Sequence, residues 1–71
     1  MSNLDRALEE FNTYVLELEV MEPDTSRKEE IRQKAITCSD LMNYSHLVVD
    51  TTSKKWVKLE ELVHKVFIYT N

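Results

Sequence analysis

The sequence predicts an all-α protein, built as a small three-helix bundle or as a helical hairpin followed by a third helix. Three observations indicate this class. The 71-residue chain has no glycine and a single proline, its apolar residues recur at helical spacing, and clusters of polar turn-forming residues separate these stretches. Tight β-hairpin turns prefer glycine-containing pairs, which are absent here. We therefore expect one helical domain over residues 1–71.

The first predicted helix covers residues 4–21. Ser2 is its expected N-cap, with Asp5 three residues later in the capping-box position. Proline disfavours helical backbone at the residue before it, so Glu22, which precedes Pro23, should mark the end of the helix. The apolar positions follow one another at spacings of 4, 3, 4 and 3, as expected for one helix face: Leu4, Leu8, Phe11, Val15 and Leu18.

A second helix is predicted from Ser26, which forms a capping box with Glu29, to about Tyr44. The connection around Pro23 is short, so this helix should fold back antiparallel to the first. A third helix is predicted over residues 54–69. The predicted core consists of Leu8, Phe11, Val15, Ile31, Ala35, Leu62 and Val66.

An α+β alternative stays open for residues 47–57. Leu47–Val49 and Lys55–Val57 could pair as a hairpin across the polar turn between them, with a shorter helix from Leu59. Short apolar runs fit a strand as well as a helix, and periodicity alone does not decide between them.

The third helix carries more apolar residues than one core-facing stripe requires. Adjacent helical residues point about 100° apart, so neighbouring apolar side chains cannot all face one core. We expect a partner-binding surface there, since tryptophan and tyrosine often anchor interfaces. Its predicted members are Trp56, Val57, Phe67 and Tyr69. Equally, the helix could be central and covered on two sides by the other two helices.

The formal net charge is −4 and is unevenly distributed. Residues 1–24 hold seven acids and one base, whereas residues 25–71 hold six acids and eight bases. An acidic chain is a poor binder of nucleic acid, but two alternatives remain. One is a nucleic-acid-associated factor using Arg27, Lys28, Arg32 and Lys34, or Lys54, Lys55 and Lys58. The other is an acidic DNA mimic, whose carboxylates step by seven: Glu10, Glu17 and Asp24.

The sequence holds no defensible catalytic, cofactor or metal site. Glu61 and His64 have the Glu-x-x-His spacing of carboxylate-bridged metal sites, but the further ligands of such a site are missing. Cys38, Asp40 and His46 match no compact zinc pattern. Cys38, the only cysteine, lies on the apolar stripe and is expected to be a small buried hydrophobe.

These observations favour a small helical regulator, inhibitor or assembly subunit that binds a protein partner, and possibly itself, over an enzyme. A chain this short buries little of its surface, so self-association or a partner would stabilise it. No apolar run approaches the length needed to cross a bilayer. We expect no cofactor, no membrane contact and a cytoplasmic location.

Overall fold

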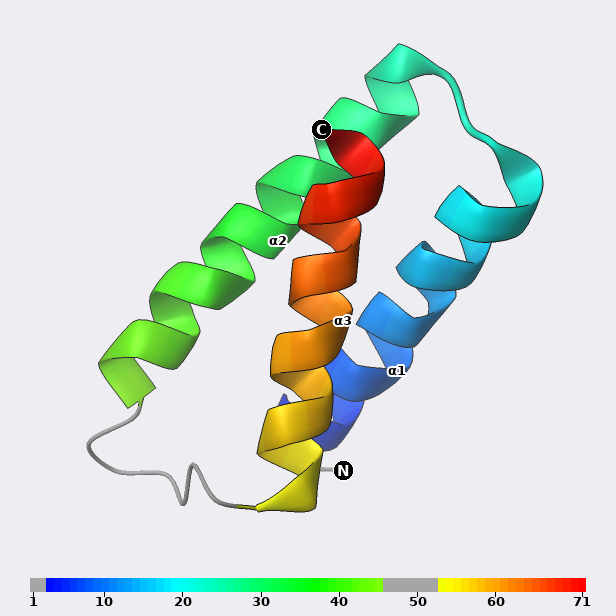
Figure 1. Cartoon of the computed structure of the whole chain (residues 1–71). Coiled ribbons are helices and arrows are strands. Elements are labelled where there is room, and N and C mark those ends of the chain that lie inside the picture. Colours follow the sequence, from blue (N-terminus) through cyan, green and yellow to red (C-terminus); the bar gives the residue numbers. More distant parts are fainter. Residues whose placement is uncertain (1–2, 46–52) are drawn as a thin grey trace.

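The computed structural model describes residues 3–45 and 53–71, which form three α-helices (Figure 1). Helix α1 spans Asn3–Leu16 and is extended by the π-helical turn η1, Glu17–Met21. Helix α2 spans Thr25–Ser45 and helix α3 spans Lys54–Thr70. α2 runs antiparallel to α1, and α3 returns parallel to α1 and packs against both. The predicted all-α bundle is confirmed.

The α+β alternative is wrong for its second strand. Lys55–Val57 lie in the first turn of α3, because Ser53 caps that helix. The Ser53 hydroxyl oxygen accepts a hydrogen bond of 3.1 Å from the backbone N–H of Trp56, which satisfies one of the amides left unpaired at a helix start. Residues 47–49 lie outside the described part of the chain.

Helix α2 begins one residue earlier than predicted, and its cap is Asp24. The Asp24 carboxylate accepts a 2.9 Å hydrogen bond from the backbone N–H of Arg27. The capping box predicted at Ser26 is therefore wrong, since Asp24 caps as well as serine does and stands directly after Pro23. The other predicted cap, Ser2, lies outside the described residues.

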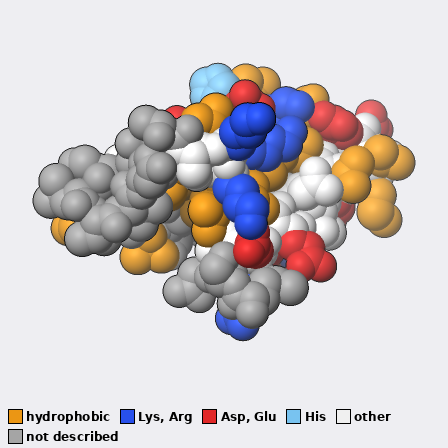
Figure 2. All heavy atoms as spheres, turned by 90° about the horizontal axis from the view of Figure 1, so that it is seen from below, with side chains coloured by type: hydrophobic (Ala, Val, Ile, Leu, Met, Phe, Trp, Pro, Cys, Tyr) orange, Lys and Arg blue, Asp and Glu red, His pale blue; other side chains and the backbone are white. Residues whose placement is uncertain are grey.

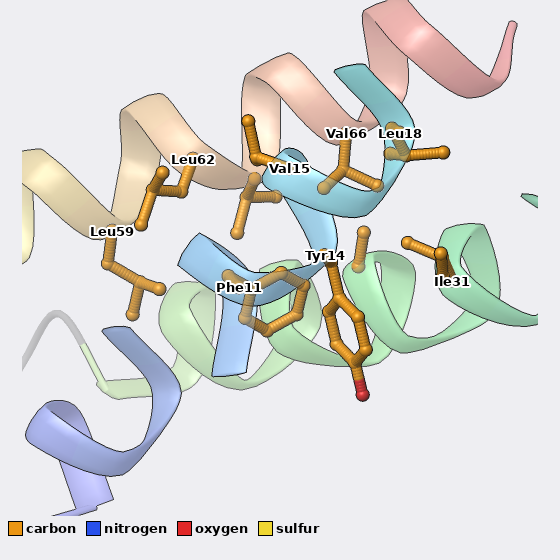
Figure 3. Close-up of a cluster of buried hydrophobic side chains, with 10 residues drawn as sticks. Phe11, Tyr14, Val15, Leu18, Ile31, Leu59, Leu62 and Val66 are labelled. Atoms are coloured by element: carbon orange, nitrogen blue, oxygen red, sulfur yellow. The ribbon is translucent and has the colours of Figure 1, made fainter. Parts of the chain in front are cut away.

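The core lies where the three helices meet (Figure 3). Six of the seven predicted core residues are buried, and Leu8 is partly buried against the same cluster. Phe11 and Tyr14 pack edge to face, with ring centroids 5.4 Å apart. Helix α3 contributes the most buried side chains because it contacts both other helices. Its buried residues are Trp56, Leu59, Leu62, Val63 and Val66.

The turn between α1 and α2 is held by Arg27. Its guanidinium donates to both carboxylate oxygens of Glu17, at 2.7 and 3.0 Å, and also pairs with Glu30 at 3.4 Å. The same guanidinium lies 5.7 Å from the centre of the Tyr14 ring. Burial and a hydrogen bond to Glu10 raise the pKa of Tyr14 to about 12. This cluster fixes the antiparallel approach of the two helices.

The π-helical turn was not predicted, because the apolar spacing fits an α-helix up to Met21. π-turns are rare and have wider turns than an α-helix. Here Leu18 is buried, while Val20 and Met21 remain about three-quarters exposed. The helix ends at Glu22, the boundary predicted from the proline that follows. The backbone of Glu22 is left-handed, with φ 44° and ψ 63°.

Candidate functional site

A groove runs between the second half of α2 and helix α3, with a volume of about 460 Å³. Helix α3 supplies Trp56, Val63 and Phe67, at spacings of seven and four residues that keep them on one face. Helix α2 supplies Met42 to the facing wall. The apolar part of the groove therefore consists of two aromatic side chains, a methionine and a valine. Such a lining is typical of sites that receive apolar groups.

Polar side chains surround this apolar part: Ser39, Asn43, Glu60 and His64. The Glu60 carboxylate accepts a 2.5 Å hydrogen bond from the indole N–H of Trp56, four residues earlier on the same helix. This bond satisfies the one polar atom of the buried Trp56 side chain and fixes the orientation of its ring. Glu60 and the α2 wall were not predicted, although the four-residue step from Trp56 to Glu60 is a signal that could have indicated the pair.

The four residues of the predicted partner surface do not lie together. Trp56 and Phe67 both line the groove, but Trp56 is only 5% exposed. Trp56 lies on the inward face of α3 together with Val63, and its role in partner binding stays a prediction. Val57, the next residue after Trp56, points about 100° away from it around the helix and is exposed. Tyr69 is also exposed, and its hydroxyl donates a 2.9 Å hydrogen bond to Glu19 on the α1 side.

A second groove, of about 440 Å³, lies between α1 and α2. Ala7 and Phe11 form its apolar floor, and Glu10 and Lys34 stand on opposite walls. Cys38 lines this groove and is half-buried rather than fully buried, as one of the side chains packed against the edge of the core cluster. Burial, with a smaller effect of Glu10, raises the pKa of the Cys38 thiol. The thiol is therefore a weak nucleophile at neutral pH. The other α2 residues on this groove are Gln33, Thr37 and Leu41.

Within residues 3–45 and 53–71, no three His, Cys, Asp or Glu side chains are grouped so that they could hold a metal ion. Glu61 is exposed on α3, whereas His64 stands at the edge of the α2–α3 groove. Cys38 lines the other groove, and Asp40 is exposed on α2. His46 lies outside the described residues.

The acidic row of the DNA-mimic alternative is not a continuous helical face. Glu10 accepts a hydrogen bond of 2.6 Å from the Tyr14 hydroxyl, and Glu17 is paired with Arg27. Asp24 lies beyond the end of the π-turn and caps α2. All three carboxylates thus have partners within the chain.

The basic residues of the nucleic-acid alternative are also partly engaged. Arg27 is held by Glu17, and Lys55 pairs with Asp5 at 2.7 Å. The Lys55 pair offsets the unfavourable position of a lysine in the first turn of α3. Figure 2, which views the bundle from below, shows several lysine and arginine side chains close together on this face, with acidic side chains beside them.

None of the described helices combines the length and the apolar character needed to cross a membrane. No protein family, curated protein or solved structure matches the chain.

Proposed function

We propose that the chain is a protein-binding module whose α2–α3 groove receives apolar side chains from a partner. The observation that carries the proposal is the composition of this groove. Trp56, Phe67 and Met42 meet in one concave site, and polar side chains border it. Protein interfaces commonly have this arrangement, in which aromatic and methionine residues form the centre and polar groups the rim.

The nature of the groove favours a partner helix or extended segment that inserts one or two large apolar residues. Met42 can adapt to different shapes, because its side chain is flexible and polarisable. Glu60 and Asn43 line the polar rim of the groove, next to which the partner's polar atoms would lie. A groove of about 460 Å³ accommodates side chains of this size.

Two adjacent residues of α2 provide a matched test. Met42 lines the α2–α3 groove, whereas Leu41 lines the α1–α2 groove on the other side of the helix. Met42→Glu places a charge in the proposed site, and Leu41→Glu makes the same chemical change outside it. A charge buried without a partner opposes binding strongly, so Met42→Glu should weaken the complex at least ~10-fold.

The experiment starts from affinity capture in the native host and identifies the captured proteins by mass spectrometry. Each captured protein is then purified, and its affinity for the wild type and both variants is measured by calorimetry. Loss of binding with Met42→Glu and retention with Leu41→Glu would support the proposal. Equal affinity for Met42→Glu and the wild type would contradict it, provided that circular dichroism shows both variants folded.

A further inference from the structure

The lining of the α2–α3 groove carries one formal charge, the carboxylate of Glu60, when histidine is counted as neutral. Its Oε1 atom accepts the hydrogen bond from the Trp56 indole, which is a neutral donor. A carboxylate has two oxygens and about four acceptor positions. One neutral donor therefore leaves the negative charge in place and most of the acceptor positions open to water or a ligand.

The surroundings of Glu60 supply no lysine or arginine to neutralise this charge. Residues three and four positions away are the neighbours of a side chain on a helix. For Glu60 these neighbours contain neither cation: Trp56, Val57, Val63 and His64. The α2 residues that line the facing wall are uncharged as well. Within residues 3–45 and 53–71, no ion pair involves Glu60.

The α1–α2 groove has a different distribution of charge. Glu10 and Lys34 stand on its opposite walls, so a ligand entering there meets both signs of charge. A ligand entering the α2–α3 groove meets only the negative charge of Glu60. A preference for one sign of charge is therefore expected at the α2–α3 groove alone.

The carboxylate of Glu60 stands beside the apolar part of its groove. Trp56 precedes it by about one turn of α3 and Val63 follows it by about one turn, so each lies roughly 5 Å away along the helix axis. A partner residue seated against this apolar wall thus brings its own neighbours within reach of Glu60. On a helical partner, these neighbours are the residues three or four positions from the apolar anchor.

We propose that the partner of the α2–α3 groove carries a lysine or arginine next to its apolar anchor, and that this cation pairs with Glu60. The inference rests on the proposed function, because it concerns the ligand of the same groove. A hydrogen bond between a cation and a carboxylate is stronger than one between neutral groups. An acidic side chain in the same position is repelled, so the groove selects basic apolar segments over acidic ones.

A phage-displayed library of random peptides, selected on the immobilised full chain, supplies probes for this site. Peptides are kept when Met42→Glu abolishes their binding and Leu41→Glu does not, since such peptides occupy the α2–α3 groove. We expect the kept peptides to combine a large apolar residue with a nearby lysine or arginine, more often than the unselected library does.

Glu60→Gln tests the charge itself, because the glutamine carbonyl can still accept the hydrogen bond from Trp56. Calorimetry should show the kept peptides bound at least ~10-fold more weakly by this variant. Glu61→Gln is the matched control: it removes the adjacent carboxylate, which is exposed and does not line the groove, and should leave the affinity unchanged. Replacing the peptide's cation by glutamine should weaken binding to the wild type equally, with little further loss on Glu60→Gln.

Two results would overturn the inference and leave the proposed groove standing. One is a set of groove-dependent peptides without a cation, and the other is equal affinity of the kept peptides for Glu60→Gln and the wild type. If no selected peptide depends on Met42, the proposed function fails and this inference fails with it. Circular dichroism shows whether Glu60→Gln is folded. The replacement in the peptide is measured on the wild type and decides the question even if that variant is not.

Discussion

The two halves of α2 differ in what surrounds them. In the first half, Ile31 and Ala35 are completely buried. In the second half, Cys38 and Met42 are only partly buried, and Leu41 and Tyr44 are largely exposed. Figure 1 shows why, because α2 and α3 diverge toward the end of α2. The first half holds the fold together, and the second half forms a wall of both grooves.

This contrast shows that an apolar stripe on a helix does not by itself predict which of its residues are buried in the core. Ile31, Ala35, Cys38 and Met42 recur at spacings of 4, 3 and 4 along one face of α2. The first two are covered by other helices and the last two border open grooves. Substitutions in the two halves should therefore have different consequences.

The largest effect is expected for Ile31→Ala. Removing a fully buried isoleucine side chain leaves a cavity and typically costs about 2–5 kcal/mol. In a chain of this size that is a large part of the free energy of unfolding. Urea unfolding followed by circular dichroism measures the loss. An unfolding midpoint close to that of the wild type would show that the first half of α2 is not part of the core.

A smaller effect is expected for the Glu17–Arg27 pair, which anchors the start of α2. The hydrogen bonds from Arg27 hold the pKa of Glu17 below its ordinary value of 4.5. The stability that the pair provides is therefore present above that value and is lost as the pH falls through the lower folded-state pKa.

Thermal melting between pH 7 and pH 3 tests this dependence. The wild type should lose more stability across this range than Glu17→Gln, whose side chain does not titrate. Glu61→Gln, on an exposed part of α3, is the control and should behave as the wild type does. If the melting temperatures of Glu17→Gln and the wild type fell equally between pH 7 and pH 3, the expected role of the pair would be contradicted.

The smallest effect on stability is expected for Tyr44→Ala. This side chain is 82% exposed, and surface substitutions usually change stability by no more than about 0.5 kcal/mol. Urea unfolding followed by circular dichroism measures this change in the free energy of unfolding. If Tyr44→Ala lowered the free energy of unfolding as much as Ile31→Ala does, the two halves of α2 would not differ in their contribution to stability.

Local signals in the sequence were sufficient for most of the fold. The apolar spacing around Phe11 and Val15 and the stop at Pro23 defined α1 and its return into α2. The cap of α2 was misplaced because Asp24 and Ser26 are both good N-caps. The π-turn left no signal, since Leu18 fits the apolar spacing of an α-helix.

The grooves were harder to predict, because they depend on how helices approach each other in space. The excess of apolar residues on α3 agrees with a helix that contacts both other helices, and Trp56 and Phe67 line a groove. The sequence did not show whether Trp56 and Phe67 are buried or exposed, because it does not show that α3 is covered on two sides. The exposure of Leu41 and Tyr44 follows from the divergence of α2, a property that no local pattern encodes.

The position of Trp56 has a practical consequence. It is the only tryptophan in the chain, and its indole lies beside the α2–α3 groove, bonded to Glu60. Its ultraviolet emission comes from a single site whose polarity changes when water leaves the groove. The native chain therefore contains a spectroscopic reporter of occupancy at that groove, without any attached dye.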